Sequence, residues 1–398
     1  MNLYRALKYG NCRLFFSGLF LSQIGIWFQN ITISWLILEM TKSPLIMGFV
    51  TFINALPLFF LTPLAGVITD KYNKKKLLFT VQILLSIQAL LITAAAVTGY
   101  LNLTSIIILG LLLNSIIAID TPLRQSSFTS LVDDKKDLSN AIAINSACFN
   151  AARLIGPAIA GILLALYGTK ICLFMCFLLV LPAIILISML KPNINNIANT
   201  EKQSIIKSLK EGLVYVKNDK TISLILIFLI FICFFGMTYP VLMPIYTKNT
   251  FNANAGLLGF LMAATGFGAL FSSFVLASKT SLSGLKNTML AGIILFGCGF
   301  LFLGLSKIPV LSIIFAFFLG AGMTASITGT NTILQQLADD NKRGRLMSLY
   351  TICYLGSASI SNLLAGTVSE FLGVEKTFIL LGLLIVLTGI ILYKKLRA

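Results

Sequence analysis

Apolar residues run along this chain in stretches of about twenty, separated by short polar or basic breaks. A helix needs about 20 mostly apolar residues to cross a bilayer. Measured against that length, the pattern predicts twelve membrane-spanning helices and an all-α membrane protein. The predicted spans are 14–38, 45–69, 77–98, 103–121, 140–167, 171–190, 222–246, 256–278, 288–306, 309–332, 346–372 and 377–393.

The basic residues predict which ends of these helices face the cytoplasm. With both termini inside, the inner segments carry 24 lysines and arginines and the outer loops carry 5, leaving Arg153 within a span. Such a bias is typical of helices inserted with their positive flanks inside. We therefore expect a multi-pass protein of the bacterial cytoplasmic membrane with both termini cytoplasmic. The bias also accounts for the net charge of +17, so we expect no nucleic-acid partner.

Composition excludes most other classes of protein. Hydrophobic residues make up 57% of the chain and charged residues 11%, whereas soluble domains carry about 25% charged residues. The chain has no histidine, and its seven cysteines stand in apolar runs without metal-ligand spacing. The sequence contains no phosphate-binding loop and no nucleophile elbow. We expect no enzymatic activity, no cofactor and no metal site.

The chain divides into two similar halves around its longest polar break. Leu131, Asp133, Asp134 and Lys136 recur 206 positions later as Leu337, Asp339, Asp340 and Lys342. Repeats of this kind build several secondary transporters, with the substrate site at the repeat interface near mid-membrane. We therefore predict a six-helix bundle at 1–190, a cytoplasmic linker at 191–221 and a second six-helix bundle at 222–398.

The linker contains a predicted amphipathic helix. Ile205, Leu209, Leu213 and Val216 recur at helical spacing, and four lysines lie around them. The pattern is consistent with a helix on the inner membrane surface. A solvated linker helix fits the pattern equally well.

The break between the second and third spans carries a recognisable pattern: Gly66, three residues, Asp70, then Lys71, Lys74 and Lys75. It resembles the first signature loop of the major facilitator superfamily, with Asn73 in place of a second glycine. The resemblance implies the twelve-helix fold of that superfamily and a loop that latches the cytoplasmic ends of the two halves. Asp120 and Arg124, near the inner end of span four, are expected to join the latch.

The fifth span carries Arg153, Gly156, Pro157 and Gly161 in a pattern that resembles the Gly-Pro signature of the superfamily's exporters. Stretches around Asp120, Asn140 and Asn150 resemble the branch with the enterobactin exporter and the macrolide efflux pumps. This resemblance implies export of a small or medium-sized organic molecule, driven by protons. A generic packing kink at Pro157 is the alternative interpretation of the same residues.

Polar residues within the spans are candidates for lining a cavity. A charge in mid-membrane costs roughly 2.5–3.5 kcal/mol, so Arg153 is expected to face the bundle interior. It either binds an anionic or carbonyl-bearing substrate or pairs with Asp120. The other stripes line a cavity or join helices by hydrogen bonds; their members are Gln23, Trp27, Asn30, Asn150, Thr328, Asn331, Tyr350 and Tyr354.

None of the thirteen acidic residues lies at mid-depth in a predicted span. Glu39 and Asp120 are the candidates for carrying the coupled proton. The sequence as a whole predicts a monomeric exporter of a drug such as a macrolide, or of a secreted metabolite such as a siderophore. It would work by alternating access and proton antiport. The alternatives are a nutrient importer of the same fold and a multi-span membrane protein without transport.

Overall fold

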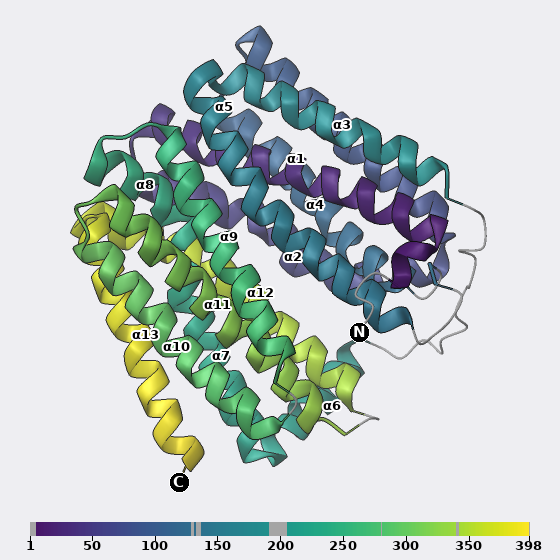
Figure 1. Cartoon of the computed structure of the whole chain (residues 1–398), viewed down its shortest axis with the longest axis vertical. Helices are drawn as coiled ribbons and strands as arrows, with labels where there is room; N and C mark the ends of the chain where they lie inside the picture. The colour runs from purple at the N-terminus through teal and green to yellow at the C-terminus, as the bar shows by residue number, and fades with distance from the viewer. Residues whose placement is uncertain are drawn as a thin grey trace. The chain divides into compact units, whose positions relative to one another are not determined.

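The computed structural model describes residues 5–128, 131–132, 137–190, 205–279, 281–339 and 342–397, and these form helices joined by short turns (Figure 1). Within these residues, one short 3-10 helix, η1, precedes thirteen α-helices. Their bounds are η1 Arg5–Lys8, α1 Gly10–Thr41, α2 Pro44–Lys71, α3 Lys74–Thr98, α4 Leu103–Ser127, α5 Leu138–Ser188, α6 Ile205–Asn218, α7 Lys220–Gly236, α8 Tyr239–Phe251, α9 Ala255–Ala277, α10 Leu282–Leu305, α11 Pro309–Leu337, α12 Arg343–Leu372 and α13 Val374–Arg397.

Ten stretches of the described residues are long and apolar enough to cross a membrane. One of them contains most of α5, whose 51 residues are too many for a single crossing at 1.5 Å per residue. Gly168 divides α5 with a left-handed φ of 77°, at the break that the sequence predicts. This division, together with the more polar α12, gives the twelve predicted crossings.

The predicted span 222–246 is made of two helices. α7 ends at Gly236 and α8 begins at Tyr239, with Pro240 in its first turn. Proline is favoured at the start of a helix, where its missing N–H leaves no hydrogen bond unmade. The apolar pattern continues through the break without interruption, so hydropathy alone did not reveal it.

Several helices begin at a residue that caps them locally. The Asn73 side chain accepts a hydrogen bond from the Lys76 amide at the start of α3, and Asp219 accepts two at the start of α7. The Asn102 and Ser105 side chains form a reciprocal capping box at the start of α4. These caps satisfy amides that have no partner within the helix.

The chain forms two compact units. Unit 1 consists of residues 1–37 and 53–201, and unit 2 of residues 38–52 and 202–398. The α2 helix therefore begins in unit 2 and ends in unit 1.

The core of unit 1 is packed around α3, α4 and α5. Phe15, Phe16 and Phe128 contact one another at ring-centroid distances of 5.4–6.2 Å. Buried aliphatic side chains such as Leu78 and Leu123 surround them. Burial of these side chains within the unit leaves the remaining apolar surface of its helices for lipid.

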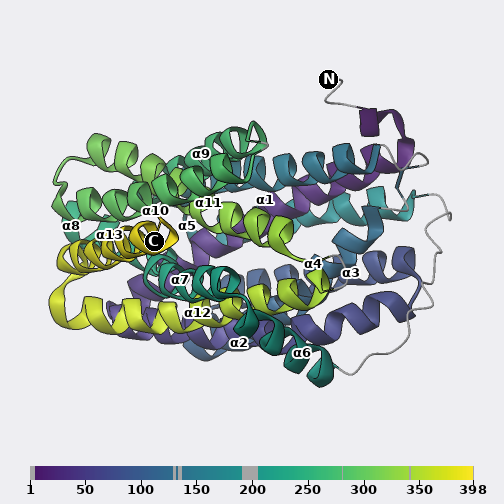
Figure 2. The ribbon, with the colours of Figure 1, turned by 90° about the horizontal axis from the view of Figure 1, so that it is seen from below.

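The core of unit 2 depends on glycines at helix crossings. A Cβ at Gly297 of α10 would lie 2.6 Å from the side chain of Val386 in α13, and one at Gly299 would lie 2.7 Å from the backbone of Leu319 in α11. Small residues at such positions allow membrane helices to approach closely. α13 accordingly lies alongside α10 in both ribbon views (Figures 1 and 2).

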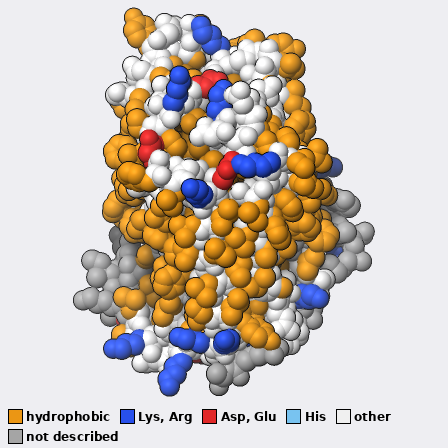
Figure 3. All heavy atoms as spheres, turned by 90° about the vertical axis from the view of Figure 1, so that its left-hand side faces the viewer, with side chains coloured by type: hydrophobic (Ala, Val, Ile, Leu, Met, Phe, Trp, Pro, Cys, Tyr) orange, Lys and Arg blue, Asp and Glu red, His pale blue; other side chains and the backbone are white. Residues whose placement is uncertain are grey.

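Hydrophobic side chains form a broad band on the face shown in Figure 3. Lysines and arginines gather beyond both edges of this band, and acidic side chains accompany them at the upper edge. An apolar band with charged borders matches the hydrocarbon core of a bilayer and its two interfaces.

Candidate functional site

The α1 and α5 helices of unit 1 cross at Gly156. A Cβ at this position would lie 2.6 Å from the Cβ of Trp27, a distance that real side chains do not show. Trp27 therefore occupies the space that any larger residue at 156 would need. Gly156, which the sequence assigns to the Gly-Pro signature, sets the distance between the two helices here.

Arg153 lies one turn before this crossing. Its guanidinium carbon is 5.9 Å from the centre of the Trp27 ring, a cation–π distance. Phe149, a further turn back along α5, meets the same ring edge to face at 6.4 Å between centroids. Phe149, Arg153 and Gly156 share one face of α5 because they are four and three residues apart.

Only 9% of Arg153 is exposed, although the residue lies near the middle of a membrane span. Burying a guanidinium there is unfavourable unless other groups stabilise its charge. The Trp27 ring supplies part of that stabilisation through its negative face. The cluster of Trp27, Phe149 and Arg153 is thus a cationic and aromatic surface within unit 1.

A second buried charge in unit 1 is paired. Asp120 Oδ2 lies 3.0 Å from Nε of Arg124, one turn further along α4, and Asp120 is 1% exposed. The Gln23 amide of α1, with its oxygen turned toward Arg124, accepts a hydrogen bond of 3.1 Å from Nη2. The structure thereby joins Gln23, which the sequence predicts to line the cavity, with Asp120 and Arg124, which it predicts to belong to the latch.

The second carboxylate oxygen of Asp120 is buried and has no hydrogen-bond partner among the described residues. A buried carboxylate that is only partly satisfied is unfavourable in its charged form. Protonation of this oxygen would therefore break no hydrogen bond in the described structure.

The lysines of the predicted latch loop contact helix ends within unit 1. Lys74 Nζ donates to the Ser126 carbonyl at the end of α4 (2.7 Å), and Lys75 Nζ donates to the Leu190 carbonyl after α5. Lysines are favoured there because the last carbonyls of a helix carry partial negative charge. Gly66, Asp70 and Lys71 belong to the last turns of α2, and their side chains lie outside the described part of the chain.

The amino-terminal segment is attached to the start of α5 by a carboxylate. Asp137 accepts hydrogen bonds from Lys8 (2.8 Å) and from the Tyr9 hydroxyl (3.0 Å). The hydrogen bond from Lys8 lowers the pKa of Asp137, and that with Asp137 raises the pKa of Lys8 to about 12. Asp133, Asp134 and Lys136, members of the predicted repeat, lie outside the described residues.

The predicted polar positions of unit 2 lie on α11 and α12. The Tyr350 and Tyr354 rings stack at 6.3 Å with an interplanar angle of 6°, and the Tyr350 hydroxyl donates to the Ile327 carbonyl (3.2 Å). Asn331 Oδ1 accepts a hydrogen bond from Gln335 (2.6 Å). Thr328, on the same helix as Asn331, is exposed.

The remaining predicted residues are dispersed. Asn30 is exposed, and the amide of Asn150 donates to the Ser146 carbonyl of its own helix (3.0 Å). Pro157 and Gly161 are buried in α5. Glu39 is exposed near the end of α1, in the segment that belongs to unit 2.

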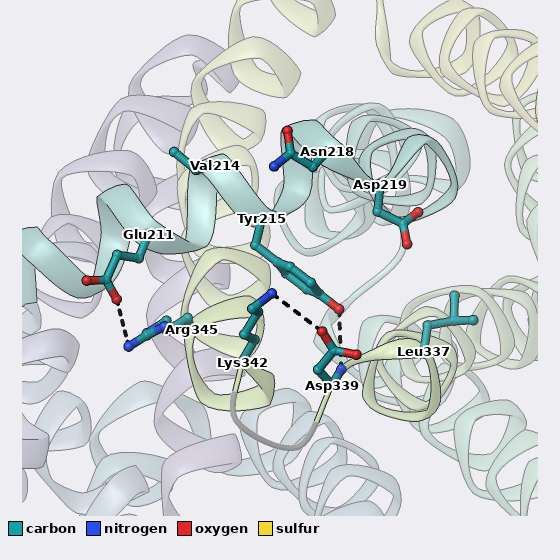
Figure 4. A pocket seen from close by; sticks show the side chains of 9 residues that line it. All are labelled: Glu211, Val214, Tyr215, Asn218, Asp219, Leu337, Asp339, Lys342 and Arg345. Carbon is teal, nitrogen blue, oxygen red and sulfur yellow. Dashed lines mark hydrogen bonds and ion pairs between the residues drawn. The ribbon is translucent and has the colours of Figure 1, made fainter.

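A cavity of about 650 Å³ lies in unit 2 beside the linker helix α6 (Figure 4). Arg345 Nη2 lies 2.6 Å from the Glu211 carboxylate, and Lys342 Nζ lies between the Tyr215 ring (4.7 Å) and Asp339 (3.6 Å). These contacts attach α6 to the start of α12. The lining residues are Glu211, Val214, Tyr215, Asn218, Asp219, Leu337, Asp339, Lys342 and Arg345. Asp340, of the predicted repeat, lies outside the described residues.

The sequence did not single out Phe149 as a site residue or predict the attachment of α6. Phe149 lies four residues before Arg153, so helical spacing alone was a sufficient signal for it. The Glu211–Arg345 pair joins residues 134 positions apart, and one sequence carries no signal for such a pairing.

Several curated proteins are similar to the whole chain. The staphyloferrin A transporter of Staphylococcus aureus is 27% identical over 389 residues, which is 96% of this chain and 95% of that protein. The multidrug efflux pump Tap of Mycolicibacterium fortuitum is 21% identical over 371 residues, covering 90% and 88%. Macrolide efflux protein A of Streptococcus pyogenes is 20% identical over 393 residues, covering 96% of each.

Solved structures share the fold. The nucleoside transporter NupG superposes with a TM-score of 0.73 at 14% identity, covering 100% of both chains. A bacterial homologue of the human lysosomal transporter Spinster superposes with a TM-score of 0.72 at 13% identity, covering 96% of both. These likenesses confirm the predicted twelve-helix architecture. The family described as transmembrane secretion effector matches residues 5–397, so the chain belongs to that family of major facilitator superfamily transporters.

Proposed function

We propose that this transporter exports a small organic molecule from the cytoplasm by alternating access, in exchange for protons. It would act as a monomer in the bacterial cytoplasmic membrane, with both termini inside. The six-helix bundles predicted at 1–190 and 222–398 would rock about the linker at 191–221. The observation that carries the proposal is Arg153, a buried charge in mid-membrane that packs on Trp27.

The Arg153 cluster favours a substrate that carries a carboxylate or another anionic group on an organic body. A guanidinium binds carboxylates through paired hydrogen bonds, and aromatic rings supply apolar contact. A relative similar over 96% of this chain is named for a siderophore, staphyloferrin A. We therefore place an anionic metabolite of the siderophore type before a macrolide as the cargo.

Asp120 is the group that we propose for proton coupling. It is buried, it pairs with Arg124 through one oxygen, and its second oxygen has no partner in the described residues. Protonation would weaken the pair and leave Arg124 held by its hydrogen bond to Gln23, which joins α4 to α1. Glu39 is exposed, so we place it second.

Gating is proposed for the loop that begins at Asp70. Lys74 and Lys75 hold the start of α3 to the ends of α4 and α5. Asp70 and Lys71 would then contact the other half of the transporter in one state of the cycle and release it in another. This latch follows from the resemblance of the loop to that of the superfamily.

Inside-out vesicles that contain the purified protein would test the proposal. An imposed proton gradient should drive uptake of a radiolabelled siderophore such as staphyloferrin A, and a protonophore should abolish that uptake. If the vesicles take up a macrolide but not the siderophore, the proposed substrate class is wrong and the proposed export function stands. Uptake that is independent of the proton gradient would contradict antiport. Flux only out of the inside-out vesicles would favour import into the cell.

A further inference from the structure

The start of α10 and the end of α13 lie side by side in unit 2. A Cβ at Gly389 of α13 would lie 2.8 Å from the Ile293 side chain of α10. A Cβ at Gly297, one turn further along α10, would lie 2.6 Å from the side chain of Val386, nearly one turn earlier in α13. The two helices are therefore antiparallel, and the start of one meets the end of the other.

Lysines mark both of these helix ends. Lys286 lies seven residues before Ile293, so it lies two turns from the contact with Gly389 and on the same face of α10. Lys394 lies five residues beyond Gly389. At 1.5 Å per residue, Lys286 and Lys394 are about 10 Å and about 8 Å from this contact along their helices, in the same direction. The two lysines thus lie at the same level of the unit.

Two further lysines adjoin them. Lys395 follows Lys394, and both are exposed. Lys279, in the turn before α10, is also exposed, and its Cδ lies 3.8 Å from the position of a Cβ at Gly284 in the first turn of α10. We call Lys279, Lys286, Lys394 and Lys395 the α10–α13 lysine cluster.

The lysine cluster has no acidic partner in the described part of the chain. None of its four ammonium groups forms a hydrogen bond or an ion pair with another described residue. The nearby basic residues of α12 differ in this respect, because Lys342 and Arg345 pair with Asp339 and Glu211. Four like charges at one end of a helix pair repel one another, so the cluster favours an anion from outside the chain.

The helix dipole explains only half of the cluster. Cations are favoured at the end of α13, where the last carbonyls carry partial negative charge. The same dipole gives no favourable role to Lys279 and Lys286, because the first amides of α10 carry partial positive charge. Positive charge on both sides of the helix pair therefore indicates a negatively charged ligand.

An exposed aliphatic stripe of α13 leads directly to the cluster. Leu383, Leu387 and Ile390 are 54%, 52% and 43% exposed. Spacings of four, three and four residues place all three on one face of the helix with Lys394. The face of the protein shown in Figure 3 has the same order, an apolar band with lysines and arginines along its lower border. A ligand of this surface therefore contacts apolar side chains and cations together.

We propose that the lysine cluster and the aliphatic stripe bind an anionic phospholipid of the inner leaflet. Its phosphate would lie among the ammonium groups, and an acyl chain would follow Leu383, Leu387 and Ile390. The inner leaflet is negatively charged and attracts lysines beside a membrane span. A soluble polyanion would contact the lysines alone and leave the stripe unused. The leaflet follows from the proposed orientation, whereas binding itself does not depend on export.

Native mass spectrometry of the delipidated protein, titrated with phosphatidylglycerol in detergent, tests the site. Lys286→Gln/Lys394→Gln should weaken binding of the first lipid at least tenfold, because each lysine beside an anionic lipid contributes to the affinity. Binding of phosphatidylcholine, which has the same acyl chains and no net charge, should be weak and unchanged. Equal binding of phosphatidylglycerol by wild type and variant would overturn the proposal.

Lys76→Gln/Lys217→Gln is the matched control. Both lysines are exposed, and both belong to segments that we expect on the cytoplasmic side, so this variant loses the same charge elsewhere. Its affinity for phosphatidylglycerol should equal that of the wild type. An equal loss in both double variants would overturn the site, because binding would then follow the total charge.

Competition separates a lipid from other anions. Inorganic phosphate or polyglutamate in large excess should not displace phosphatidylglycerol from the wild type, because neither contacts the stripe. Displacement by phosphate would show that the lysines hold a free anion, and displacement by polyglutamate would favour an acidic protein partner. Either result would overturn the lipid assignment. Leu387→Ala/Ile390→Ala should weaken lipid binding and leave all four lysines in place.

Thermal unfolding excludes a trivial loss of structure. Without lipid, Lys286→Gln/Lys394→Gln should be at least as stable as the wild type, because two unpaired charges that repel each other are removed. Phosphatidylglycerol should raise the unfolding midpoint of the wild type more than that of the variant, since a ligand stabilises the state that binds it. A less stable lipid-free variant would indicate a structural role and overturn the proposal. Absence of export by the wild type would contradict only the proposed function, because none of these measurements uses flux.

Discussion

Gly156 of α5 leaves no space for a side chain against Trp27 of α1: a Cβ there would lie 2.6 Å from the Cβ of the tryptophan. The contact places a residue of the predicted exporter signature at a helix crossing beside the buried Arg153. It therefore links the Gly-Pro pattern to a specific packing geometry.

Gly156→Ala should destabilise the protein. The added methyl group would force α1 and α5 apart, and such overpacking costs typically about 1–3 kcal/mol. The thermal unfolding midpoint of the purified protein in nanodiscs measures the effect. Gly344→Ala is the control, because a Cβ there would have no described atom within 4 Å beyond its chain neighbours and its own helix backbone. An equal loss of stability in both variants would contradict this packing role.

Arg153→Lys should lower export of an anionic substrate roughly tenfold, although it retains the positive charge. An ammonium lacks the planar fork that binds a carboxylate in two places and that stacks on the Trp27 ring. The initial rate of substrate uptake into inside-out vesicles measures the loss, and Lys170→Arg serves as a control remote from the cluster. Full activity of Arg153→Lys would favour a purely structural charge.

Asp120→Asn should abolish the dependence of export on the proton gradient. The same variant removes the carboxylate that pairs with Arg124, and breaking a buried ion pair costs about 3–5 kcal/mol. Asp120→Asn/Arg124→Gln should recover much of this stability without recovering the coupling. Comparison of unfolding midpoints with gradient-driven flux separates the two effects. Gradient-driven flux that persists in the double variant would exclude Asp120 as the coupling group.

The ion pair between Lys8 and Asp137 should make the attachment of the amino-terminal segment sensitive to pH. The pKa of Asp137 is lowered on folding from its ordinary value of 3.8, so its contribution is complete above that value and is lost as the pH falls below it. The pKa of Lys8 is raised from 10.5 to about 12, so its contribution is lost as the pH rises through that interval.

Protection of the Ala6 and Tyr9 amides from hydrogen exchange measures this attachment. Both amides lie beside the pair, and Ala6 donates to Asn140 (2.8 Å). Relative to the unfolded exchange rate, protection should fall at both ends of the pH range in the wild type. In the Lys8→Met variant, protection of the same two amides should be low over the whole pH range. Equal protection of wild type and Lys8→Met at pH 7 would show that the ion pair contributes nothing.

The crossings could be predicted from the sequence because they depend on short-range pattern. A run of apolar residues signals each span, and Gly168 signals the division of α5. The break before Pro240 was missed because the apolar pattern continues through it. The proline was visible, but hydropathy could not show whether it would begin a new helix or bend one.

The candidate site was only partly predictable, because its contacts depend on how each helix is rotated about its axis. The sequence placed Arg153 and Gly156 in the same Gly-Pro pattern, and the cost of a buried charge marked Arg153 as functional. Helical spacing could not show that Gln23 meets Arg124 or that Glu370 caps α2. Those contacts join residues about 100 and 325 positions apart, and one sequence contains no signal for their pairing.

Residues 38–52 pack with a part of the chain that is synthesised more than 150 positions later. A polypeptide that stops at 190 would expose this segment without its neighbours, and one that begins at 222 would lack it entirely. Expression of the two pieces separately should therefore yield poorly folded products, and coexpression should restore them only where one piece can donate that segment to the other. Biogenesis of the first hairpin would then finish only after the ribosome has delivered α12.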